Sequence, residues 1–87
     1  MIEQIKPLID LCFYDEEQAA SFLRLNQKLH HTTQLKDAEG WHILFFCSSA
    51  PPSTAIKDRS GRVIGQWRYA TGEMKHRLEI HGLLPSN

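Results

Sequence analysis

Residues 41–48 read Trp41-His42-Ile43-Leu44-Phe45-Phe46-Cys47-Ser48, and they decide the fold. Every second position from Trp41 is apolar, and Leu44 and Phe46 add apolar side chains to the other row. Because successive side chains of a strand point to opposite faces of the sheet, this pattern predicts a β-strand. A strand that is apolar on both faces is usually covered on both. We therefore expect a strand with a covering layer on each face.

The preceding segment, residues 15–31, predicts a helix that covers one of these faces. Asp15 is placed as the N-cap and Gln18 follows three residues later, the arrangement of a capping box. Apolar side chains then recur at helical spacing from Ala19 to Leu29. The segment therefore presents one apolar stripe for packing.

The opposite face of strand 41–48 needs a second cover, because one helix shields one side only. Residues 2–13 are rich in apolar side chains whose spacing favours a helix over a strand. Pro7 is tolerated only in the first turn, so a short helix would begin near Lys6. A first strand is the alternative, and the pattern leaves the choice open. Either these residues or a second subunit would cover the face, so a homodimer is a hypothesis.

The rest of the chain alternates with period two and contains turn residues at regular places. We expect strands at 32–36, 53–57, 62–70 and 73–82, joined by turns at 37–40, 58–61 and Thr71-Gly72. The fold class is thus α+β, with N-terminal helical segment(s) packed on a mainly antiparallel, four- to five-stranded β-meander. Residues 1–87 contain no linker or repeat and are expected to form a single domain.

The register of the last two strands follows from the two-residue loop at Thr71-Gly72. This loop opposes Tyr69 with Met74 and Trp67 with His76. The same reasoning on the preceding hairpin opposes Lys57 with Arg62 and Ile56 with Val63. The sheet then has an apolar face for the helix and a basic outer face.

Composition excludes several classes of protein. Ten Lys+Arg balance ten Asp+Glu, so a globally basic nucleic-acid clamp is not expected. The longest apolar run is Ile43–Cys47, far short of the roughly 20 residues that a membrane helix needs, and residues 1–10 lack the pattern of a secretory signal. Cys12 and Cys47 lie in apolar stretches, which is typical of reduced, buried thiols. We expect a cytoplasmic location and no membrane association.

The histidines do not have the spacing of a metal site. A zinc site needs three or four converging ligands. The chain has five histidines, His30, His31, His42, His76 and His81. The first two are adjacent on the expected helix and point in different directions, and His76 and His81 fall on opposite faces of the expected strand. We predict no metal and no cofactor, and we expect His76 to be a hydrogen-bonded core residue opposite Trp67.

Catalytic motifs are also missing from the sequence. Gly-rich phosphate loops, His-Glu-x-x-His, Cys-x-x-Cys and Gly-x-Ser-x-Gly do not occur. The run Cys47-Ser48-Ser49 is the one suggestive nucleophile, and it needs an adjacent base. His42 faces away from Cys47 on the expected strand, and no carboxylate is placed to orient it. We therefore predict no catalytic residue and no enzymatic activity.

Charge is distributed unevenly along the chain. Residues 1–23 contain five acids and one lysine, and residues 57–77 contain six Lys/Arg and two acids. The cations of the second segment form the predicted partner-binding set, which is Lys57, Arg59, Arg62, Arg68, Lys75 and Arg77. If residues 62–82 form the expected hairpin, most of this set shares the outer sheet face. The alternative is that these cations are simply solvated and have no binding role.

Such a face suits an acidic protein surface or phosphate groups. The sequence therefore predicts a non-enzymatic protein-interaction module, adaptor or regulatory, that binds an acidic partner surface. A small nucleic-acid-binding domain using the same face is the alternative. It ranks second because Trp67 and Tyr69 point the other way and leave the face without aromatic rings to stack on bases.

Overall fold

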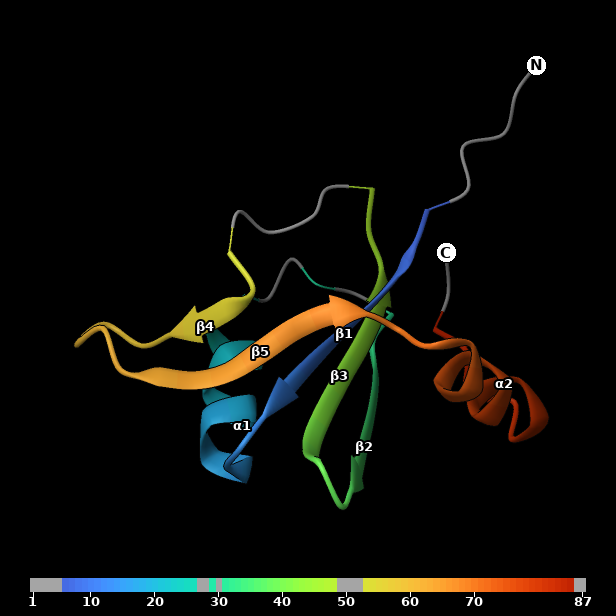
Figure 1. Cartoon of the computed structure of the whole chain (residues 1–87), viewed down its shortest axis with the longest axis horizontal. Coiled ribbons are helices and arrows are strands. Elements are labelled where there is room, and N and C mark those ends of the chain that lie inside the picture. Colours follow the sequence, from blue (N-terminus) through green and yellow to red (C-terminus); the bar gives the residue numbers. More distant parts are fainter. Residues whose placement is uncertain (1–5, 27–28, 30, 49–52, 86–87) are drawn as a thin grey trace.

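The computed structural model describes residues 6–26, 29, 31–48 and 53–85. In chain order the elements are β1 (Leu8–Phe13), α1 (Glu16–Leu25), β2 (Thr33–Asp37), β3 (Gly40–Phe46), β4 (Ala55–Lys57), β5 (Val63–Tyr69) and α2 (Gly72–Ile80). The strands form one antiparallel sheet in the order β2-β3-β1-β5-β4 (Figure 1). This confirms the α+β class and the antiparallel sheet.

The strand β1 is the centre of the sheet, where the sequence favoured a helix. It pairs with β3 on one side and with β5 on the other, and every residue except Cys12 is buried. A short apolar run fits a helix and a two-sided strand equally well, so its spacing could not decide between them. The preferred helix over 2–13 is wrong for residues 8–13, and the alternative strand is correct there. Residues 1–5 lie outside the described part of the chain.

The expected meander is wrong because β1 separates two hairpins. β2 pairs with β3, β4 pairs with β5, and β1 lies between the two pairs. At Gly65 in β5, an added Cβ atom would lie 2.4 Å from the backbone oxygen of Cys12. Since real Cβ atoms do not approach so closely, a residue without a side chain lets β5 lie against β1 here.

The helix α1 begins where the sequence predicted and ends earlier. The Asp15 side chain accepts a hydrogen bond from the Glu17 backbone N–H at 3.0 Å, which confirms the N-cap. The Asn26 side-chain amide donates to the Phe22 carbonyl at 2.8 Å, and its backbone N–H donates to the same oxygen. These local bonds complete the last turn at Leu25. The expected end residues Lys28 and His30 are not among the described residues, and His31 lies outside the helix.

The largest difference from the sequence prediction is the segment 73–82, which was expected to be a strand. It forms α2, and the Thr71 hydroxyl caps its N-terminus by accepting from the Met74 N–H at 3.1 Å. Met74 and Leu78, four residues apart, are its buried positions. One helix therefore lies between strands and one at the C-terminal end, and His76 is exposed on α2 instead of packed in the core.

The expected pairing of the last two strands consequently does not form, and β5 pairs with β1 and β4 instead. The β4–β5 hairpin exists, but its register differs from the predicted one. Lys57 pairs with Val63 and Ile56 pairs with Gly65, with an irregularity between Ile56 and Lys57. The predicted pairs Lys57–Arg62 and Ile56–Val63 are wrong, because five residues instead of four separate Lys57 from its partner and the irregularity shifts the ladder by one more residue at Ile56.

The two helices cover opposite faces of the sheet (Figure 1). The α1 side buries Ala19 with Ile9, Leu11, Phe13, Ile43 and Phe45. The α2 side buries Met74 and Leu78 with Leu8 and Leu44. The second apolar row of β3 is thus covered by α2 of the same chain, so the argument from an uncovered face no longer supports a homodimer. No helix within the described ranges is both long enough and apolar enough to cross a bilayer.

Candidate functional site

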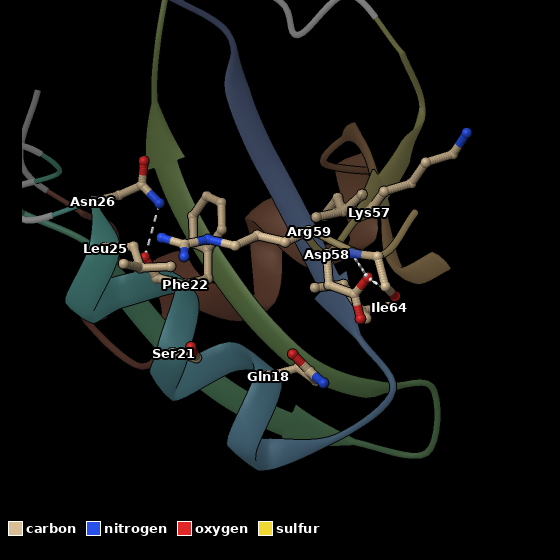
Figure 2. A pocket seen from close by; sticks show the side chains of 11 residues that line it. Gln18, Ser21, Phe22, Leu25, Asn26, Lys57, Asp58, Arg59 and Ile64 are labelled. Atoms are coloured by element: carbon tan, nitrogen blue, oxygen red, sulfur yellow. Dashed lines mark hydrogen bonds between the residues drawn. The ribbon is translucent and has the colours of Figure 1, made fainter. Parts of the chain in front are cut away.

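A groove of about 720 Å³ lies between α1 and the β4–β5 hairpin (Figure 2). It arises because α1 packs against β1 and β3, at the centre of the sheet, while β5 and β4 extend beyond it. Phe22 and Leu25 line it from α1, and Ile56, Arg59 and Ile64 line it from the hairpin. Its volume is in the range of clefts that hold ligands.

The groove has apolar walls continuous with the hydrophobic core. Phe22, Ile56 and Ile64 are half-buried and pack against the core cluster on the α1 side. The Phe22 ring lies 5.3 Å from the Phe13 ring, centre to centre. Leu25, at the end of α1, is 70% exposed. These side chains offer apolar contact area that the chain itself does not fully cover.

Two cationic side chains line this groove, and they point in different directions. Figure 2 shows the Arg59 side chain pointing from the β4–β5 turn towards Phe22 and Leu25 of α1, whereas Lys57 points away from the helix. Both residues are exposed. Among the ion pairs of the described residues, neither Arg59 nor Lys57 has a carboxylate partner. Arg59 therefore brings a positive charge that is not neutralised by an ion pair to an apolar groove.

The turn that holds Arg59 is ordered by its neighbour Asp58. The Asp58 carboxylate accepts from the Ser60 hydroxyl at 2.6 Å, from the Ser60 N–H at 2.9 Å and from the Arg62 N–H at 3.0 Å. These bonds, that of the Ser60 hydroxyl first, hold the pKa of Asp58 below its ordinary value. Asp58 is thus used to build the turn and does not pair with Arg59.

The structure divides the predicted partner-binding cations among three places. Lys57 and Arg59 line the groove, and Arg62 belongs to the same turn. Arg68 projects from β5 on the side of the sheet that α2 covers, and Lys75 and Arg77 belong to α2. The single basic sheet face is therefore wrong, because it required residues 73–82 to be a strand.

Arg68 and Arg77 are engaged in ion pairs at the edge of a buried network. The Arg68 guanidinium lies 3.3 Å from Asp10 Oδ2 and 2.9 Å from Glu39 Oε1. The Arg77 guanidinium lies 3.4 Å from Asp37 Oδ2. These two arginines are neutralised within the chain, and we remove them from the candidate binding set.

At the centre of this network is His42, which sequence reasoning left without a carboxylate partner. Its Nδ1 lies 2.7 Å from Asp10 Oδ1, and its Nε2 lies 2.7 Å from Asp37 Oδ1. The side chains of His42 and Asp10 are fully buried. The pairing of β1 with β3 creates this contact between residues 32 positions apart, and the one sequence signal was a lone acid, Asp10, inside an apolar strand.

The geometry favours one protonation state of His42. Each ring nitrogen faces a carboxylate oxygen, and a ring with a proton on both nitrogens can donate to both carboxylates. Burial lowers the pKa of His42, but the hydrogen bonds and charges of Asp10 and Asp37 outweigh it and raise the pKa above the ordinary histidine value. Geometry and pKa shift together favour an imidazolium between two carboxylates.

Three donors near the β2–β3 turn could be considered for a metal. Asp37, Glu39 and His42 each place one ligand atom within 4.8 Å of the others. Each already has a protein partner, since Arg77 contacts Asp37, Arg68 contacts Glu39 and Asp37 contacts His42. The arrangement serves an ion network, and we assign no metal to it.

Cys12 lines a cavity of about 180 Å³ beside this network, together with Tyr14, Glu39, Gln66 and Arg68. Burial, followed by the charges of Asp10 and Glu39, raises the pKa of the Cys12 thiol. Since the thiolate is the reactive form, Cys12 is a poor nucleophile. In the suggestive run at the end of β3, Ser49 lies outside the described residues.

The chain was compared with known protein families, curated proteins and solved structures. No protein-family model matches the chain, and searches of curated proteins and of solved structures found no match. The arrangement of the groove is therefore the basis on which a function is proposed.

Proposed function

We propose that this chain is a non-enzymatic protein-interaction module that binds an acidic segment of a partner protein in the groove between α1 and the β4–β5 turn. The observation that supports the proposal is Arg59. Its guanidinium group points across an apolar groove and has no ion-pair partner within the described part of the chain.

The chemistry of the groove selects one kind of occupant. Its apolar walls need apolar side chains, and Arg59 needs a carboxylate that can form a bidentate pair with the guanidinium. Lys57 at the rim adds a positive charge that favours approach of an acidic segment. A peptide in which an Asp or Glu stands beside apolar residues meets both requirements, whereas a segment with basic residues only lacks the carboxylate and a wholly polar segment lacks the apolar side chains.

The structure also favours a protein partner over a nucleic acid. Of the six cations predicted for the binding face, Arg68 and Arg77 are neutralised by acids, so a continuous basic track is not available. Nucleic-acid binding depends on such a track because the phosphates supply most of the affinity. Three of the remaining four cations, Lys57, Arg59 and Arg62, are gathered at one turn beside an apolar groove, and the fourth, Lys75, lies on α2.

A selection from a display library of random linear peptides tests the proposal, because it requires no identified partner. We expect wild-type protein to enrich sequences with Asp or Glu next to apolar residues. Arg59→Glu should weaken binding of an enriched peptide by about tenfold, because an exposed ion pair of up to about 1 kcal/mol is replaced by repulsion. Arg59→Lys should retain a large part of the affinity, because it keeps the charge.

Lys75→Glu is the matched control, because Lys75 is exposed on α2, on the opposite side of the sheet. It should leave peptide binding unchanged. Equal losses in the Arg59→Glu and Lys75→Glu variants would refute the groove as the site. Enrichment of peptides without acids, or none, would refute the acidic occupant.

The nucleic-acid alternative is tested with labelled single- and double-stranded oligonucleotides between about 50 and 200 mM salt. Binding that falls steeply with salt would replace the proposal by that alternative. The cytoplasmic location and the homodimer stay predictions from the sequence.

A further inference from the structure

We propose that His42, Asp37 and Arg77 form a proton-dependent latch that holds α2 on the sheet. The latch lies on the face opposite the groove, so it is independent of the proposed function. A continuous chain of contacts runs from the buried centre of the sheet to the C-terminal helix.

The chain of contacts crosses three elements. His42 of β3 contacts Asp37 of β2 through Nε2 at 2.7 Å, and the other oxygen of Asp37 lies 3.4 Å from the Arg77 guanidinium of α2. Asp37 thus holds the imidazolium with one oxygen and the helix with the other. Whatever moves this carboxylate changes both contacts.

The rest of the attachment of α2 is small. Met74 and Leu78 pack on Leu8 and Leu44, and the other positions of the helix are exposed. Beyond the helix, the Thr33 hydroxyl donates to the Leu83 carbonyl. Arg77–Asp37 is the ion pair between α2 and the sheet among the described residues. A change at Asp37 therefore acts on a helix with few other contacts.

The charges of the network balance only when His42 is protonated. The carboxylates that face this cluster are Asp10 of β1, Asp37 of β2 and Glu39 of the β2–β3 turn. The cations are His42 itself, Arg68 of β5 and Arg77 of α2. Cys12 of β1 lies beside Asp10 and Glu39 with its thiol neutral. Removal of the His42 proton leaves one negative charge in excess.

A neutral imidazole has one N–H, so one of its two carboxylate contacts must fail. Asp10 is fully buried and needs its donor, because an unsatisfied buried charge is costly. Asp37 is 21% exposed and can turn towards water. The remaining proton therefore stays on Nδ1 and the contact with Asp37 is lost. Asp37 Oδ1 keeps the Glu39 backbone N–H, at 2.9 Å, so the carboxylate opposite Arg77 is held less firmly.

The direction of the pKa shift of His42 determines whether stability rises or falls with pH. Because the folded pKa of His42 lies above its unfolded value, its contribution to stability is complete below about pH 6.5, the ordinary value for histidine. The contribution is lost as the pH rises through the folded pKa. We expect α2 to be held most firmly at acidic pH and to loosen at alkaline pH.

The test is hydrogen exchange of the full chain, followed by NMR from below about pH 6.5, the ordinary histidine pKa, to alkaline pH. After correction for intrinsic exchange, protection of the α2 amides should fall with pH by up to about tenfold per unit, the limit for one proton. The β1 amides should change less over the same range. The His42 ring resonances should titrate at the same midpoint as the α2 protection.

Variants separate the latch from general destabilisation. Arg77→Gln should lower α2 protection at acidic pH and abolish its pH dependence, while His42 still titrates. His76→Gln and His81→Gln, on the exposed side of α2 and at its end, should leave the response unchanged. Equal loss of protection in α2 and β1, no pH dependence, or a pH response that survives in Arg77→Gln would each overturn the latch.

Discussion

Replacement of Asp10 by Ala removes a fully buried carboxylate that has two partners, His42 Nδ1 at 2.7 Å and Arg68 Nε at 3.3 Å. Removing one member of a buried ion pair costs about 3–5 kcal/mol, because the remaining charge keeps its desolvation penalty and loses its partner. The total stability of a chain of this length is roughly 4–13 kcal/mol. We therefore expect Asp10→Ala to remove a large fraction of the free energy of unfolding.

Urea denaturation followed by Trp fluorescence measures this loss. With a slope of about 2 kcal/mol per molar urea, a loss of 4 kcal/mol lowers the midpoint by about 2 M. Glu16→Gln is the matched control, since Glu16 is an exposed acid and should change stability by less than about 0.5 kcal/mol. A midpoint for Asp10→Ala within about 0.3 M of wild type would refute the buried ion network.

A double-mutant cycle tests the same contact and separates its energy from the general destabilisation that each substitution causes. Asp10→Ala and His42→Ala remove partners of one contact, so the double variant should cost clearly less than the sum of the single variants. Additive losses would mean that Asp10 and His42 do not interact. If Asp10→Ala fails to fold, Asp10→Asn serves in the cycle, because it keeps the shape of the side chain.

Three further predictions test the packing of the fold by thermal unfolding. Leu78→Ala should cost about 2–5 kcal/mol, because this side chain is fully buried between α2 and the sheet; a loss below about 1 kcal/mol would mean that α2 is not docked there. Gly65→Val should cost about 3 kcal/mol or more, since its Cβ would lie 2.4 Å from the Cys12 oxygen; a stable variant would contradict the pairing of β5 with β1. Asp15→Ala should cost about 0.5–2 kcal/mol through loss of the bond to the Glu17 N–H, and no change would argue against the N-cap.

The elements that the sequence predicted well are those with local signals. Asp15 and the acids after it mark the start of α1, and the two apolar rows of 41–48 mark a strand that is covered on both faces. The turn at Asp58 was predicted from its composition, and Asp58 does accept the bonds that close it. In each case the residues that determine the structure are close together in the chain.

The elements that the sequence missed depend on partners far away in the chain. β1 is a strand because it pairs with β3 and β5, and nothing within residues 8–13 distinguishes that from a short helix. For α2, the N-cap Thr71 and the four-residue spacing of Met74 and Leu78 were present in the sequence. A hairpin with its turn at Thr71-Gly72 was compatible with the same residues. The pairing of β5 with β1 excludes that hairpin.

The candidate site was predicted in part. Lys57 and Arg59 belonged to the expected binding set, and both line the groove. The apolar wall supplied by Phe22 and Leu25 was not foreseen, since it depends on where α1 crosses the sheet. The acids that neutralise Arg68 could not be assigned either, because Asp10 and Glu39 reach it through strand pairing.

The most direct test of the proposed function is a map of where an enriched acidic peptide binds. We would titrate such a peptide into isotope-labelled wild-type protein and follow the backbone amide resonances. We expect shifts concentrated at α1 around Phe22 and Leu25 and at the turn around Arg59, and we expect these shifts to be lost in Arg59→Glu. Shifts concentrated on α2, or shifts of equal size in Arg59→Glu, would contradict it.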